Sequence, residues 1–366
     1  MTTTARDALI RAGRSRLTWP VLALVALLLV NVIVTPSFFD IRLQDGHLYG
    51  SLIDILKNGA PTLLIALGMT LVIATRGIDL SVGAVVAIAG AVACTSIAGA
   101  ADSGGAAAAF TGIGLALLLC AVLGFWNGFL VSVLGIQPII ATLVLMITGR
   151  GIAMLITDGQ IVTVNNPYYA GVGAGFVVLP VAILISVGMF ALVGLVTRRT
   201  ALGMLIESVG INPKASRLAG VRSRTIVWTV YVFCALCAAV GGLMISSNVS
   251  AADANNAGLW IELDAILAVV IGGTALSGGR YSLTGTLVGA LLIQTLTTTV
   301  YTTGIAPEIT LVFKALVVIV VCLIQAPKAR ALLRRRRTPV APPNAAAPPE
   351  PAVAVETTPT RKVGQR

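Results

Sequence analysis

Ten long apolar segments separated by short polar turns dominate this sequence of 366 residues. A helix that crosses ~30 Å of hydrocarbon needs about 20 mostly apolar residues. Only 11% of the residues are charged, whereas a soluble domain carries about 25% because water must solvate its surface. We therefore predict an all-α, polytopic membrane helix bundle with about ten transmembrane helices. These are about Leu17–Val34, Pro61–Thr75, Val82–Ala100, Ala106–Leu134, Ile139–Thr157, Phe176–Val196, Thr225–Ser246, Ile261–Ala275, Ser282–Thr302 and Glu308–Gln325.

Basic residues cluster on one predicted side of this membrane domain. Four arginines precede the first span, and the segment Thr197–Arg224, hereafter the basic loop, holds six basic residues with Glu207 as its only acid. More follow the last span. Cytoplasmic loops carry such an excess of Lys and Arg, so both termini are predicted to be cytoplasmic. The net charge of +11 thus reflects membrane orientation, and we predict no nucleic-acid partner.

The predicted organisation has three parts. Residues 1–16 form a cytoplasmic N-terminal segment, and residues 17–326 form the transmembrane domain, which contains the basic loop 197–224. Residues 327–366 are first basic and then rich in proline and alanine, a composition typical of a disordered tail. Two apolar segments, 61–75 and 261–275, are short enough to be re-entrant rather than spanning.

Two polar interruptions each follow a short apolar segment: Arg76–Ser81, hereafter the first break, and Leu276–Arg280, the second break. Short or broken helices at comparable places in two halves of a chain indicate a translocation pathway. Two ordinary cytoplasmic hairpin turns would give the same pattern. Asp79 is costly near hydrocarbon, so we expect it to be paired, with Arg76 as candidate partner, or to lie at a wet boundary.

Further polar residues fall inside or beside the predicted spans. Asn127 could donate to a sugar hydroxyl while the neighbouring Trp126 stacks on the ring, or it could hold two helices together. Glu262 and Asp264 are expected near the outer boundary, where water would solvate them.

Catalytic motifs are missing from the sequence. No G-x-x-x-x-G-K-[ST] loop cradles a phosphate, and neither H-E-x-x-H nor G-x-S-x-G occurs. Cys234 and Cys237 lie in an apolar segment without acids, so we interpret them as small buried residues rather than a metal or redox site. His47 is the single histidine. We predict a chain that is not an enzyme, binds no metal or cofactor and hydrolyses no nucleotide itself.

The basic loop contains its own helical pattern. Between Ala201 and Arg217, apolar residues recur at helical spacing, and Gly210 and Asn212-Pro213 are placed to bend or end the helix. This predicts a short amphipathic helix on the cytoplasmic face. It could be an ordinary interfacial loop or an element that docks into a groove of a cytoplasmic protein.

Two motifs carry a family resemblance. ESVGINPKASRLAGV, in the basic loop, resembles the coupling-loop signature of ABC importer permeases of the ribose/xylose/arabinose/galactoside branch. GMTLVIATRGIDLSVGAVVAIAG is similar to a second block of that family, with Arg76 where glycine is common. The runs LQDGHLYGSLIDIL and ADANNAGLWIELDAI most resemble the galactofuranose-type permease. Ser208 and Ser216 depart from the usual alanines, and the resemblance covers about Ile53 to Lys314.

The resemblance implies the permease subunit of an ATP-binding-cassette importer in the bacterial inner membrane, moving a monosaccharide. Implied partners are a cytoplasmic ATPase subunit that binds MgATP, a second permease chain and a periplasmic or lipoprotein sugar-binding protein. An ion-coupled secondary transporter or facilitator is the alternative. The predicted coupling residues are Gly203, Glu207, Gly210, Asn212, Ala215 and Gly220. The predicted pathway residues are Asp79, Asn127 and Asn256.

Overall fold

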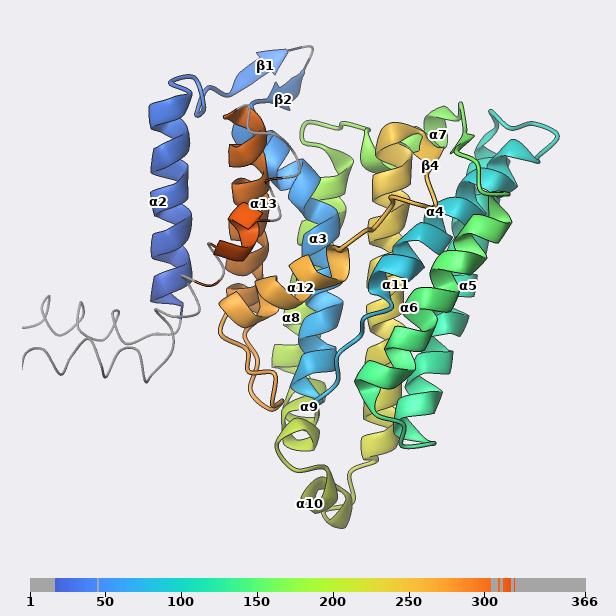
Figure 1. Ribbon diagram of the computed structural model, residues 1–366, viewed down its shortest axis with the longest axis vertical. Helices are drawn as coiled ribbons and strands as arrows, with labels where there is room; N and C mark the ends of the chain where they lie inside the picture. The colour runs from blue at the N-terminus through green and yellow to red at the C-terminus, as the bar shows by residue number, and fades with distance from the viewer. Residues whose placement is uncertain (1–16, 45, 304–308, 310–311, 317–318, 320–366) are drawn as a thin grey trace, which may run out of the picture. The chain divides into compact units, whose positions relative to one another are not determined.

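The computed structural model describes residues 17–44, 46–303, 309, 312–316 and 319, and it consists mainly of α-helices (Figure 1). The predicted terminal segments 1–16 and 327–366 and most of the tenth predicted span lie outside the described residues. The helices are α2 (Thr18–Val34), α3 (Ser51–Ala74), α4 (Val82–Ala98), α5 (Ala106–Ser132), α6 (Pro138–Ile156), α7 (Pro167–Gly173), α8 (Val181–Arg199), α9 (Leu202–Ile211), α10 (Pro213–Leu218), α11 (Ser223–Val249), α12 (Ile261–Ile271) and α13 (Leu283–Thr302).

Four very short strands accompany the helices and form two antiparallel pairs. β1 (Arg42–Gln44) pairs with β2 (His47–Tyr49) in the loop between α2 and α3. β3 (Val162–Thr163) pairs with β4 (Ala251–Ala252), which joins the segment after α6 to the segment after α11. The fold class is therefore helical, as predicted, with small strands confined to the loops.

α3 lies at the centre of the bundle, next to α11, α12 and α13. Every residue from Gly59 to Ala74 is buried. Small residues permit this close packing: a Cβ on Gly68 would lie 2.8 Å from the Cα of Cys234 in α11. Cys234 and Cys237 are both buried and free, in agreement with their predicted packing role.

The prediction that the second span begins at Pro61 is wrong. α3 begins at Ser51 and has 24 residues, so it is long enough to cross a membrane, and Pro61 lies inside it. The charged residues Asp54 and Lys57 suggested a loop. In the structure Asp54 is exposed and Lys57 half-buried, while Ile53 and Ile55 are buried. The first turns of α3 are thus amphipathic, which a search for purely apolar segments does not detect.

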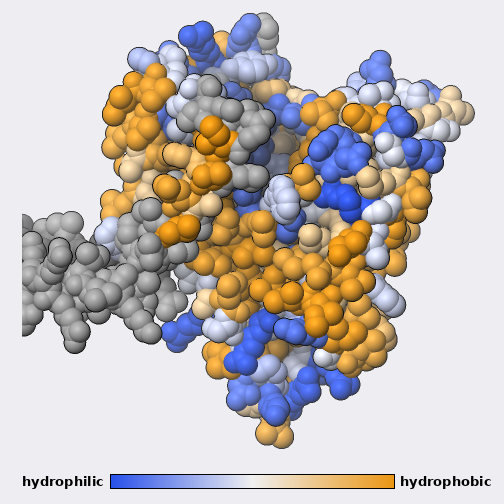
Figure 2. All heavy atoms as spheres, viewed as in Figure 1, coloured by the Kyte–Doolittle hydropathy of each residue, from blue (hydrophilic) through white to orange (hydrophobic). Residues whose placement is uncertain are grey.

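Apolar side chains cover the outside of the bundle. α5, α6 and α8 expose leucine, isoleucine and valine residues along their length, for example Leu118 at 64% and Ile147 at 66%. Figure 2 shows apolar residues across the middle of the face in view and hydrophilic residues at the lower end, where α9 and α10 lie. A soluble protein rarely exposes so large an apolar surface, so lipid is the solvent that fits it.

Six helices in the described part of the chain are long and apolar enough to cross a membrane: α3, α5, α6, α8, α11 and α13. α2 and α4 have 17 residues each. α12 has 11 residues, so it extends only about 16 Å. The chain is a multi-pass membrane protein, while the number of ten spans and the cytoplasmic placement of both termini stay predictions.

The starts of α4 and α12 meet inside the bundle. A Cβ on Gly83 would lie 2.4 Å from a carboxylate oxygen of Glu262 and 2.6 Å from the carbonyl oxygen of Gly258. Figure 1 shows both helices inclined against the long axis of α3, with the first break running from the lower end of α3 up to α4. The two interrupted elements are therefore neighbours in space, although about 180 residues separate them in the sequence.

Candidate functional site: the basic loop and the helix breaks

The basic loop folds into α9 and α10, with the bend where the sequence predicts it. α9 ends at Ile211 and α10 begins at Pro213, which suits the first position of a helix because it lacks an N–H. The Asn212 side chain accepts hydrogen bonds from the backbone N–H groups of Lys214, at 3.1 Å, and Ala215, at 3.0 Å. Asn212 is therefore an N-cap that fixes the angle between the two helices.

The other predicted coupling residues fall into two groups. Gly203 and Gly210 are buried, and a Cβ on Gly210 would lie 1.8 Å from the carbonyl oxygen of Ala74. These glycines allow α9 to pack on the helical bundle and cannot themselves touch a partner. Ala215 and Gly220 are exposed and Glu207 is half-buried, so these three are accessible from outside.

Three exposed apolar side chains on the basic loop were missed in the sequence. Met204 is 68% exposed, Ile211 58% and Leu218 90%. The helical spacing that predicts the amphipathic helix draws attention to Leu202 and Ile206, which face the bundle instead. All three point away from the bundle, so they are accessible from outside. Together, Met204, Ile211 and Leu218 are hereafter the docking residues.

A pocket of about 340 Å³ lies between α9 and the start of α13. Arg198 and Glu207 line it on the side of the basic loop, and Tyr281 and Thr284 line it on the side of the second break. Burial raises the pKa of the Tyr281 hydroxyl, and the negative charge of Glu207 raises it further. Tyr281 therefore stays a neutral hydrogen-bonding group in the pocket that Arg198 and Glu207 also line.

The end of α3, the end of α9 and the second break form one contact, hereafter the junction. Arg76 donates hydrogen bonds to the carbonyl oxygens of Gly210 and Ile211. The backbone N–H of Gly279 donates to the carbonyl oxygen of Ala74 at 2.9 Å. The prediction that Arg76 pairs with Asp79 is wrong, because the Arg76 side chain points to α9 instead.

Asp79 belongs to a buried polar cluster instead. Its carboxylate accepts hydrogen bonds from the backbone N–H of Ser81 at 3.0 Å and from the Ser81 hydroxyl at 2.5 Å. The Ser81 hydroxyl accepts in turn from the side-chain amide of Asn127 at 2.9 Å. Asp79 and Asn127 are each 1% exposed. The cluster ties the start of α4 to α5, so Asn127 acts in helix packing here.

The pairing of Asn127 with Trp126 for sugar binding does not hold in this structure. Trp126 is 53% exposed on the outside of α5, whereas Asn127 points to the buried Ser81. Neighbouring residues on a helix face different directions, which accounts for the separation. The Asn127 amide oxygen and the Tyr231 hydroxyl are buried without a hydrogen-bond partner. Both groups are therefore free to form a further hydrogen bond.

Asn256, the third predicted pathway residue, lies exposed in the loop that leads to α12. Its side chain donates to Asp253 at 2.7 Å, and the backbone N–H groups of Asn255 and Asn256 donate to the same carboxylate. The hydrogen bond from the Asn256 side chain is the main cause that lowers the pKa of Asp253. Arg150 in α6 holds the loop by donating to the carbonyl oxygens of Ala254, at 3.1 Å, and Ala257, at 2.6 Å.

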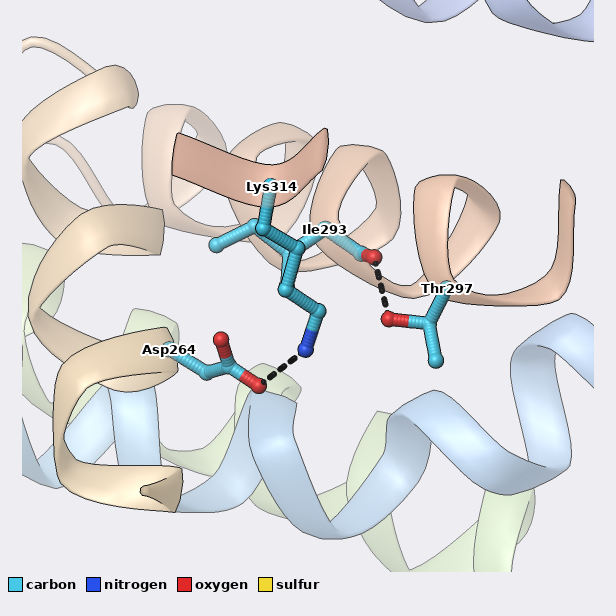
Figure 3. A network of polar contacts seen from close by, with 4 residues as sticks. All are labelled: Asp264, Ile293, Thr297 and Lys314. Carbon is cyan, nitrogen blue, oxygen red and sulfur yellow. Dashed lines mark hydrogen bonds and ion pairs between the residues drawn. The ribbon is translucent and has the colours of Figure 1, made fainter. Parts of the chain in front are cut away.

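The expectation that water solvates Glu262 and Asp264 is wrong. Glu262 is 5% exposed and packs against the start of α4. Asp264 forms an ion pair with Lys314 at 2.8 Å, shown in Figure 3 beside α13. The two acids therefore anchor α12 inside the bundle.

The described residues contain no group of three His, Cys, Asp or Glu side chains that could hold a metal ion. The arrangement has an exposed basic loop, a polar loop before α12 and interrupted helices inside the bundle, which suits the movement of a solute.

Comparison with known proteins decides the class. The family described as "Branched-chain amino acid transport system / permease component" matches residues 51–322. The chain belongs to this permease family. The permease is 48% identical over 337 residues to the galactofuranose transporter permease protein YtfT of Escherichia coli (strain K12), which covers 89% of this chain and 95% of that protein.

Two further relatives extend the comparison. The fructose import permease protein FruF of Bifidobacterium longum (strain NCC 2705) is 42% identical over 88% of this permease and 92% of its own length. The ribose import permease protein RbsC of Escherichia coli (strain K12) is 35% identical over 82% of this permease and 92% of its own length. No solved structure gives a significant match.

Proposed function

We propose that this permease is the membrane subunit of an ATP-binding-cassette importer and moves a monosaccharide, galactofuranose or a related pentose or hexose, into the cytoplasm. The observation that carries the proposal is the identity of 48% with a galactofuranose transporter permease over 89% of the chain. The sequence has no phosphate-binding loop, so the free energy of ATP must come from a separate subunit that binds MgATP.

The basic loop is the proposed contact with that ATPase. The docking residues expose apolar surface among basic side chains, which suits a groove on a soluble protein. Glu207 is accessible and lines the neighbouring pocket. Gly203, Gly210 and Asn212 support this surface by packing and capping, while Ala215 and Gly220 lie on its exposed side.

Asn256 is the proposed pathway residue on the other end, because its loop is polar and exposed and leads directly into α12. Asp79 and Asn127 are proposed to border the pathway in another conformation of the transporter, since they are buried here. A second permease chain would complete the pathway, and a secreted or lipoprotein sugar-binding protein would deliver the sugar. The proposed location is the bacterial inner membrane with both termini in the cytoplasm.

Reconstitution in liposomes tests the proposal. The permease is inserted together with its ATPase and sugar-binding protein, and uptake of radiolabelled galactose, fructose and ribose is measured. We expect uptake only with ATP on the ATPase side, and none when the phosphate-binding lysine of the ATPase is replaced. Uptake by the permease alone under a proton or sodium gradient would instead establish an ion-coupled transporter.

A substitution at Glu207 tests the docking surface within the same system. Glu207→Arg reverses the only acidic charge of the basic loop while leaving the buried face of α9 unchanged. We expect weaker ATPase binding and weaker stimulation of ATP hydrolysis, with normal membrane insertion. Wild-type values for both would remove Glu207 from the proposed contact.

A further inference from the structure

We propose that Arg76 is a positioning residue for transport: it links the basic loop to the first break, so that a displacement of α9 is passed to the start of α4. The inference rests on the proposed function, in which an ATPase pushes or pulls the basic loop. It concerns a side chain that would touch neither sugar nor ATP.

The first argument is the chemistry of the Arg76 contacts. Its guanidinium donates to the carbonyl oxygens of Gly210 and Ile211, the last two residues of α9. The last four carbonyl groups of a helix have no partner within the helix, and this end carries a partial negative charge. A cation with several N–H donors is the side chain best suited to bind there.

The second argument is the backbone of Arg76. Its φ is +67°, a left-handed conformation that costs free energy for any residue except glycine. Strain of this kind persists only where the surroundings hold it, and it often marks a functional position. Backbone hydrogen bonds at the end of α3 hold this conformation, from the N–H of Arg76 to the carbonyl oxygen of Ile73 and from the N–H of Gly77 to that of Val72, each at 2.9 Å. Gly278 leaves room for the Arg76 side chain, because a Cβ there would lie 2.3 Å from the Arg76 Cγ.

The third argument is the direct contact of three segments at the junction. The missing side chain of Gly210 allows the carbonyl oxygen of Ala74 and the N–H of Gly279 to approach α9. Gly279 in turn donates to Ala74 at 2.9 Å. The end of α9 therefore cannot shift without moving Arg76, the end of α3 or the second break, since close packing leaves no free space between them.

The fourth argument is the short path from Arg76 to α4. Three residues further along the chain, Asp79 binds Ser81, which directly precedes α4 and accepts from Asn127. Thr142 in α6 holds the same segment, because its hydroxyl oxygen accepts from the N–H of Leu80 at 3.1 Å. The first break is thus held by α9 at one end and by α5 and α6 at the other.

Three variants and one control test this role in the reconstituted transporter. Arg76→Gln removes the charge, Arg76→Lys keeps it with a single donor group, and Arg76→Gly removes both the contacts and the backbone strain. The control is Arg42→Gln, an exposed arginine in β1, which lies outside the basic loop and the junction. The measured quantities are radiolabelled galactose imported per ATP hydrolysed, ATPase affinity and melting temperature.

We expect Arg76→Gln and Arg76→Gly to import about three- to tenfold less galactose per ATP, within the range of about two- to thirtyfold found for residues that couple two sites. ATPase affinity should stay within twofold of wild type, and Arg76→Lys should recover part of the loss. Arg76→Gly should not melt earlier, because glycine adopts the left-handed backbone without strain. An unchanged ratio in Arg76→Gly, or a parallel loss of import and hydrolysis with earlier melting, would overturn the proposal.

Hydrogen exchange of the permease alone, in nanodiscs, tests the contact independently of transport. The backbone amides of residues 205–212 should exchange faster in Arg76→Gln and Arg76→Gly than in wild type or Arg42→Gln. Equal exchange in all four would contradict the role of Arg76. If the wild-type complex hydrolyses ATP without importing any of the tested sugars, the proposed function is contradicted. The hydrogen-exchange result would then still test the role of Arg76.

Discussion

The two helix breaks look alike in sequence, but different forces hold them. The first break is buried at Asp79 and Ser81, whose side chains bind each other and the neighbouring helices. The second break exposes Leu276 and Ser277 and turns through Gly278 and Gly279, both with positive φ. At Gly279, a backbone hydrogen bond to the carbonyl oxygen of Ala74 connects the second break to the end of α3.

From the sequence, each break could be either an element of a translocation pathway or an ordinary hairpin turn. The structure distinguishes these two interpretations. The first break is buried inside the helix bundle, which fits an element of a translocation pathway. The second break is an exposed turn at the end of the bundle, close to the pocket beside α9. Both meet at the junction, so a movement of the basic loop reaches one break through side chains and the other through backbone contact.

The largest expected effect is at the junction, where both breaks meet α9. In Gly210→Ala the new Cβ would lie 1.8 Å from the carbonyl oxygen of Ala74, so backbone must move. We expect a loss of about 3 kcal/mol in the free energy of unfolding, measured by thermal and denaturant unfolding in detergent. The matched control is Gly194→Ala in α8, where no atom lies within 4 Å of the new Cβ. Equal stability of the two variants would show that α9 does not pack as described.

The next effect distinguishes the two breaks directly. Asp79→Ala leaves the buried N–H of Ser81 without its acceptor, which should cost about 2 kcal/mol of stability. Asp79→Asn keeps an acceptor oxygen and should cost less. Ser277→Ala, at the exposed second break, should change stability by no more than about 0.5 kcal/mol. Equal losses in Asp79→Ala and Ser277→Ala would remove the distinction between the breaks.

The helices and the basic loop could be predicted from the sequence, because long apolar segments and clustered arginines are local patterns. The start of α3 was missed, because Asp54 and Lys57 suggested a loop although they lie on the less buried side of a helix. The prediction that Arg76 pairs with Asp79 was also wrong. Its positive φ turns the side chain to α9, and such a contact across more than 130 residues is set by tertiary packing.

The smallest effect concerns the exposed loop before α12. Asn256→Ala removes the main hydrogen bond that lowers the pKa of Asp253, so this pKa should rise towards its ordinary value. A lowered pKa in the folded state stabilises the loop above the pKa of the unfolded chain, and this contribution is lost as the pH falls through the folded value. Carbon-13 NMR of labelled aspartate in nanodiscs measures the titration. An unchanged Asp253 titration would place the cause elsewhere.

The affinity of the ATPase for the permease in nanodiscs tests most directly whether the basic loop is the docking surface. Leu218 is 90% exposed on the basic loop, and Ile161 is 61% exposed in the loop after α6. Leu218→Asp should weaken ATPase binding about tenfold or more, as for a central apolar contact, while Ile161→Asp should leave it unchanged. Equal affinity of wild type and Leu218→Asp would contradict the assignment of the basic loop as the docking surface.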